Sequence, residues 1–164
     1  MSRIKPNEMN QFMIQNIGSG YRVGIVHLEM VREGRSLYGM ETFHNAKEAV
    51  ETVRPLFEKA DREMMVVMSL DIKNTPIAVE IVAVGGIDNC VIDVRNIFKH
   101  AVISNASNII CFHNHPSGIP EPSEDDKAIT RRIKEAGILL GIPLIDHIIV
   151  GNDSYYSLEE HKEL

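Results

Sequence analysis

The sequence has few of the features that mark secreted or membrane-spanning proteins. It contains two cysteines, Cys90 and Cys111, too few for a disulfide framework in a chain of 164 residues. No apolar run approaches the roughly 18 to 20 residues that cross a bilayer. The opening segment, MSRIKPNEMN, lacks the apolar core of a secretory signal. We therefore expect a protein of the reducing cytoplasm with no membrane partner.

An excess of basic residues, common in nucleic-acid-binding domains, is also missing. Lys and Arg number 17 against 23 Asp and Glu, which gives a formal net charge of −6. The densest basic cluster, formed by Arg131, Arg132 and Lys134, fits the solvated face of a helix better than a track for phosphates. The charge disfavours nucleic acid as a partner, although a local basic patch is compatible with a negative total.

Helix and strand patterns alternate along the chain and predict an α/β domain. Asn45 and Glu48 have the spacing of a helix-capping pair, and the apolar spacing behind them predicts a helix to about Ala60, kinked or shortened by Pro55. Strands are predicted at 64–71, 77–85, 108–113, 143–151 and 155–158, the first two as a hairpin.

Two further helices are predicted to begin at the capping residues Asp93 and Ser123, and Gly137 is expected to end the second of them. Residues 1–44 are predicted to form an N-terminal arm followed by strands at 21–31 and 37–43, and residues 45–164 the main domain. A free-edged strand in the N-terminal part would permit a homodimer.

The stretch CFHNHPSGIPEPSEDD, residues 111–126, carries the main chemical signal. Side chains alternate between the faces of a strand, so His113 and His115 project to the same side. Ser123 and Asp126 share a face in the first turn of the following helix, so Asp126 can turn back toward the histidines. Two imidazole nitrogens and one carboxylate oxygen would leave a fourth tetrahedral position for water, the pattern of a catalytic zinc site.

Such a site also needs a carboxylate that takes a proton from the zinc-bound water and passes it to the leaving group. Glu63, at the entry to strand 64–71, and Glu80, within the next strand, are both candidates, and spacing does not choose between them. A plainer interpretation makes Ser123 and Asp126 a helix cap, which is compatible with metal binding. His147 is interpreted as a core or edge histidine rather than a fourth ligand.

The joint pattern His-x-His-Pro, six residues, Ser, two residues, Asp resembles the JAMM motif of JAB/MPN-domain metalloproteases. The finer string HNHPSGxPxPSxxD, followed by a helix and LLGIPLIDHIIVG, resembles the RadC branch of that family, over roughly residues 45–160. The resemblance implies a JAB/MPN fold, with a mixed central sheet flanked by helices in a cytidine-deaminase-like layout.

The resemblance also assigns roles to individual residues. It implies that His113, His115 and Asp126 bind Zn²⁺ and that Ser123 helps to stabilise the developing oxyanion. The family's glutamate stands at the start of the strand after the first helix, which here is Glu63 rather than Glu80. The implied enzyme is a hydrolase that cleaves a peptide or isopeptide bond in a protein substrate.

Two other functions compete with the zinc peptidase. One is a non-catalytic or DNA-associated repair or recombination module that retains the zinc site. Many RadC-like chains begin with a helix-hairpin-helix module, but the residues after NIGSGYRV have a strand pattern, so we do not expect that module here. The other is a zinc deaminase, which ranks last because position 115 is His instead of Glu and no Pro-Cys-x-x-Cys follows.

Overall fold

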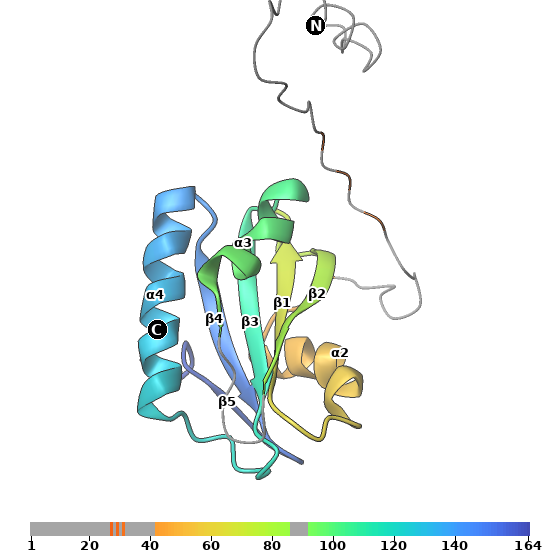
Figure 1. Ribbon diagram of the computed structural model, residues 1–164, viewed down its shortest axis with the longest axis vertical. Helices are drawn as coiled ribbons and strands as arrows, with labels where there is room; N and C mark the ends of the chain where they lie inside the picture. The colour runs from red at the N-terminus through yellow and green to blue at the C-terminus, as the bar shows by residue number, and fades with distance from the viewer. Residues whose placement is uncertain (1–26, 28, 30, 32–41, 86–91) are drawn as a thin grey trace, which may run out of the picture.

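Five strands form one mixed sheet in the part of the chain that the computed structural model describes, residues 27, 29, 31, 42–85 and 92–164. The elements run in the order α2 (Ala46–Phe57), β1 (Met64–Leu70), β2 (Pro76–Val84), α3 (Val94–Ile103), β3 (Asn108–Asn114), α4 (Glu124–Leu140), β4 (Leu144–Val150) and β5 (Tyr155–Ser157). The strand order is β2-β1-β3-β4-β5, with β3 and β4 parallel and the other neighbours antiparallel. The predicted mixed sheet flanked by helices is confirmed (Figure 1).

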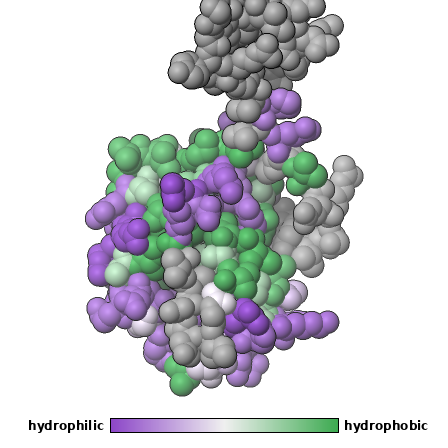
Figure 2. Space-filling model, in the orientation of Figure 1, coloured by the Kyte–Doolittle hydropathy of each residue, from purple (hydrophilic) through white to green (hydrophobic). Residues whose placement is uncertain are grey.

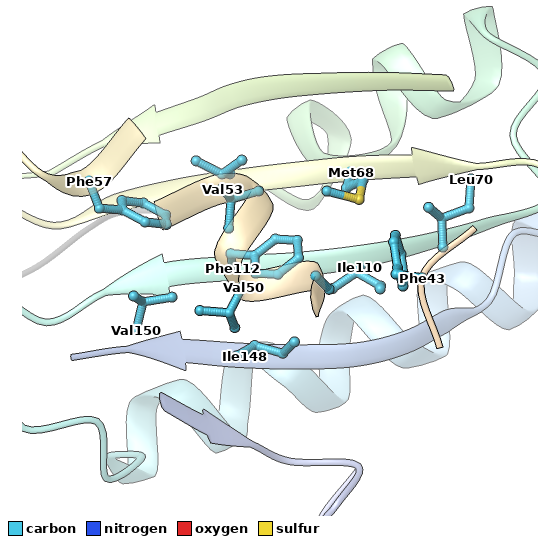
Figure 3. Packing of buried hydrophobic residues seen from close by; sticks show 12 residues of the cluster. Phe43, Val50, Val53, Phe57, Met68, Leu70, Ile110, Phe112, Ile148 and Val150 are labelled. Carbon is cyan, nitrogen blue, oxygen red and sulfur yellow. The ribbon is translucent and has the colours of Figure 1, made fainter. Parts of the chain in front are cut away.

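The central strands are covered on both faces, which explains their uninterrupted apolar sequences. Along β1, Val66 and Met68 pack toward α2, whereas Met65 and Val67 pack toward α3 and α4. Figure 3 shows the α2 side of this core, where Phe112 of β3 lies among side chains of β1, β4 and α2. The two layers therefore hold β3 firmly in the middle of the sheet.

The end of α4 differs from the prediction that Gly137 stops the helix. The helix continues to Leu140, and Gly141 ends it in the left-handed conformation, with φ of 69°. Gly137 is buried inside the helix because the following chain folds back against it. A Cβ at that position would lie 2.7 Å from the carbonyl oxygen of Ile142. Glycine is thus required there by close packing and not by the helix terminus.

The first helix also ends earlier than predicted, at Phe57 instead of near Ala60, with Pro55 inside its last turn. Most of the predicted arm and strands of residues 1–43 lies outside the described residues, and the described positions among them, 27, 29, 31, 42 and 43, are in no strand. The boundary between residues 44 and 45 stays a prediction. Among the helices that the structure describes, none has the length and apolar character needed to cross a bilayer.

The outward face of α4 is polar along most of its length. Arg131, Arg132 and Lys134 are all exposed, which confirms that this basic cluster lies on a solvated helix face. The C-terminal end of the helix is different, because Ile138 and Leu139 are largely exposed there. Figure 2 shows apolar colour at the upper left of the molecule, where α4 ends in Figure 1.

We predict that Gly137→Ala destabilises the fold, although alanine has a helix propensity better than that of glycine by about 1 kcal/mol. The added Cβ would press on backbone atoms, and overpacking of this kind costs about 1–3 kcal/mol. The urea-unfolding midpoint should therefore fall. Glu135→Ala, on the exposed face of α4, is the control and should change the free energy of unfolding by less than about 0.5 kcal/mol. Equal midpoints for the two variants would contradict the packing argument.

Candidate metal centre

The three predicted metal ligands meet where β3 ends and α4 begins, in the lower part of Figure 1. The Nε2 atom of His113 lies 3.2 Å from Oδ1 of Asp126, and Nε2 of His115 lies 3.5 Å from Oδ2. The two Nε2 atoms are 2.9 Å apart. Among the described residues, this is the one group of His, Cys, Asp and Glu side chains whose geometry could hold a metal ion.

The N-terminal cap of α4 orients the carboxylate of Asp126. The backbone N–H of Asp126 donates to Oγ of Ser123, and the backbone N–H of Ser123 donates to Oδ2 of Asp126 at 2.7 Å. The hydroxyl of Ser123 also donates to Oδ2, at 2.6 Å. The capping interpretation is therefore confirmed, and it is compatible with metal binding because Oδ1 still faces His113.

The proton of His115 points away from the centre. Its Nδ1 atom lies 2.7 Å from the backbone carbonyl oxygen of Ile119. A carbonyl oxygen only accepts hydrogen bonds, so Nδ1 must carry the proton. In the neutral ring Nε2 then holds a lone pair, and this atom faces Asp126.

A buried chain of polar groups orients His113 in the same way. The hydroxyl of Thr130 donates to the backbone carbonyl oxygen of Asp126 at 2.6 Å, so its oxygen accepts from Nδ1 of His147, also at 2.6 Å. Burial lowers the pKa of His147 to about 3, so this ring is neutral and its Nε2 is an acceptor. That atom lies 2.9 Å from Nδ1 of His113, which must donate to it. His113 therefore also presents the lone pair of Nε2 to the centre.

The resulting donor set fits a divalent metal ion. Two imidazole lone pairs and one carboxylate converge, and the side chains of His113, His115 and Asp126 are only 7, 15 and 17% exposed. Closely spaced lone pairs with little water around them repel one another unless a cation lies between them. Fixing the outer nitrogen of a histidine with a hydrogen bond is also the usual support for a metal ligand. Two nitrogens and one oxygen are a common ligand set for zinc.

The electrostatics of the three ligands point the same way. Burial opposes ionisation of Asp126, but the hydrogen bonds that His113 and His115 donate when a proton occupies Nε2 lower its pKa well below the ordinary range. In turn, the hydrogen bond to Asp126 raises the pKa of His115, against the effect of burial. The carboxylate thus attracts positive charge to the Nε2 atoms, where a proton and a metal ion compete.

Of the two candidate proton acceptors, Glu63 lies at this end of the sheet. β1 and β3 pair with Met65 opposite His113, and Glu63 stands immediately before β1, two residues from Met65. The negative charge of Glu63 contributes to the raised pKa of His115. Glu80 pairs with Val67 on the far side of β1, away from the ligands.

Two buried residues support the ligands, and the sequence predicted the place of one of them. His147 is fully buried and hydrogen-bonded on both nitrogens, which confirms its interpretation as a core histidine. Thr130 was not recognised as part of the site. Its position four residues after Asp126, one helical turn away, was the one signal that could have pointed to it.

Comparison with known proteins gives a consistent set of relatives. A family model described as a RadC-like JAB domain matches residues 43–163. A UPF0758 protein of Thermotoga maritima is 44% identical over 104 residues, which are 63% of this chain and 47% of that protein. A UPF0758 protein of Clostridium tetani is 39% identical over 135 residues, 81% of this chain and 59% of its own length. The chain spans about half the length of the curated relatives it matches.

We predict that Thr130→Val weakens zinc binding by about 10- to 100-fold, because His147 loses the acceptor that holds its tautomer and His113 loses its support. Competition with a chromogenic chelator measures the affinity. Thr52→Val is the matched control, since the hydroxyl of Thr52 also donates to the carbonyl four residues before it, on α2. Equal zinc affinities in the two variants would show that the polar chain does not support the ligands.

Proposed function

The chain belongs to the RadC-like JAB domain family, and from this membership and the geometry of its metal centre we propose that it is a zinc-dependent metallopeptidase or isopeptidase. The observation that supports the proposal best is the orientation of the two histidines. Both ring protons are held by acceptors outside the centre, so both Nε2 lone pairs face the carboxylate of Asp126. A structural role in the helix cap alone would not require this arrangement.

His113, His115 and Asp126 would hold the ion, which leaves one tetrahedral position open. Zinc bound by these three residues would polarise a carbonyl and lower the pKa of a water molecule to about 7. Glu63, half-buried immediately before β1, takes the proton of the attacking water and delivers it to the leaving amine. Water attacks the carbonyl carbon, the C–N bond breaks, and the products are an acid and an amine.

Ser123 has a further part in this mechanism. Its hydroxyl donates to Oδ2 of Asp126, and the residue is exposed at the N-terminus of α4. With a metal ion held by Asp126, this O–H would turn from the carboxylate and donate to the carbonyl oxygen on which negative charge develops. The substrate is a peptide or protein, because the reacting groups are suited to an amide bond.

The alternative is a DNA-associated repair or recombination module that retains the metal site. The exposed cluster of Arg131, Arg132 and Lys134 is the basic feature available for it on α4, but Glu124 and Asp125 are exposed on the same helix. DNA binding that weakens steeply with salt would favour this alternative, because phosphate contacts release counterions.

We predict about one zinc ion per chain in the zinc-supplemented protein and its loss in Asp126→Ala. Mass spectrometry of the metal content measures both, and circular dichroism checks that the variant is folded. Asp125→Ala removes an exposed acid of the same helical turn and should keep the zinc. Full zinc content in Asp126→Ala would remove this carboxylate from the ligand set.

We predict that Glu63→Gln retains zinc but loses hydrolysis by about 10²- to 10⁴-fold, because the amide cannot accept the proton of the attacking water. The assay uses fluorogenic peptides and isopeptide-linked lysine peptides with the full chain. Glu80→Gln is the matched control and should keep its activity, since Glu80 lies on β2 away from the centre. Hydrolysis that survives both Glu63→Gln and a zinc chelator would rule out this mechanism.

A further inference from the structure

We propose that Asn114 is a positioning residue that sets the place of Glu63 through the backbone of the neighbouring strand. The inference rests on the proposed function, in which Glu63 handles the proton. Asn114 stands between the two histidines in sequence, but its side chain projects to the opposite face of the strand. It is 5% exposed, so its polar atoms need partners inside the protein.

The side chain of Asn114 has two backbone partners, one in the first residue of β1 and one two residues before that. Backbone pairing between β1 and β3 extends to Met65 and His113. Beyond that pair, Oδ1 of Asn114 accepts from the backbone N–H of Met64 at 2.8 Å. Its Nδ2 donates to the backbone carbonyl of Arg62 at 3.1 Å. The side-chain amide therefore acts as a peptide group does and continues the pairing where the strands end.

These two bonds lie on either side of Glu63. On the opposite edge, the carbonyl oxygen of Glu63 accepts from the backbone N–H of Gly85 at 2.8 Å. The backbone around Glu63 is thus held from the β3 side by Asn114 and from the β2 side by Gly85. Because the Cα–Cβ direction follows from the backbone, these bonds restrict where the carboxylate can reach.

The arrangement joins the proton acceptor to the metal ligands through one short segment. His113 and His115 face Asp126 at the end of the strand. Asn114, between them in sequence, holds the backbone on both sides of Glu63. A displacement of about 1 Å at a reacting group can cost about 10²-fold in rate, so holding both parts on the same three residues matters for the chemistry.

The chemistry of the side chain explains why an amide is needed. Met64 offers a donor and Arg62 an acceptor, so the group between them must accept at one atom and donate at another. A carboxylate lacks the donor, and a hydroxyl has a single oxygen that does not span the two groups. We therefore expect that Asn114→Ala and Asn114→Ser both release Glu63.

Crystal structures of the full chain grown with zinc test the proposal without a substrate. In wild type, the Glu63 carboxylate should lie beside His115, and in Asn114→Ala it should be displaced or spread over several positions. Asn108→Ala is the matched control, since Asn108 lies at the other end of β3 and its side chain also makes a hydrogen bond, to Asn74. An unmoved Glu63 carboxylate in Asn114→Ala would overturn the proposal, and if that variant does not fold, Asn114→Ser decides in the same way.

Kinetics separate positioning from a general loss of stability. With a fluorogenic peptide that wild type cleaves, Asn114→Ala should lower kcat at least about tenfold with KM and zinc content unchanged. Added to Glu63→Gln, it should cause no further loss, because both changes remove the same function. Additive losses would overturn the proposal. Absence of zinc or of any cleavage in wild type would refute the proposed function instead, while the crystal structures still decide the role of Asn114.

Discussion

β3 pairs with β1 so that His113 stands opposite Met65, and every part of the candidate site depends on this register. A slip of one residue would turn His113 and His115 to the other face of the sheet and bring Asn114 to the metal side. The register is secured by burial on both faces, since Phe112 packs toward α2 and Cys111 toward α3 and α4. A slip would therefore exchange the two cores as well as the ligands.

The site is supported by a polar network inside an otherwise apolar layer. His147 and Thr130 are almost fully buried, and each leaves a costly unpaired group if its partner is removed. Their hydrogen bonds link β3, β4 and α4, the three elements that must keep a fixed distance for the ligands to meet. The same hydrogen bonds therefore support the metal ligands and hold these three elements together.

At the start of α4, the carboxylate of Asp126 both caps the helix and faces the two histidines. Asp126 satisfies the backbone N–H of Ser123 and lies where the helix dipole favours negative charge. The same charge faces the Nε2 atoms of His113 and His115. Because the helix cap holds Asp126 in place, the carboxylate is oriented before any ion binds, which lowers the entropy lost on binding.

The sequence by itself determined the features that depend on short-range chemistry. The spacing of His113, His115, Ser123 and Asp126 sets the ligand geometry within one strand, one loop and one helical turn, so it could be predicted. The buried strands and the caps at Asn45, Asp93 and Ser123 follow from local periodicity and local hydrogen bonds, and these are confirmed too.

Only the tertiary structure decided the features that depend on how distant segments meet. Gly137 and Gly141 carry the same helix-ending signal, and the fold-back of the chain onto Gly137 distinguishes them. Spacing in the sequence does not choose between Glu63 and Glu80, and the strand order separates them, because Glu80 lies on β2, across β1 from the strand that carries His113. The bond from Asn114 to Arg62 joins residues 52 apart, and no local pattern encodes it, because its donor and acceptor become neighbours only when β1 and β3 pair.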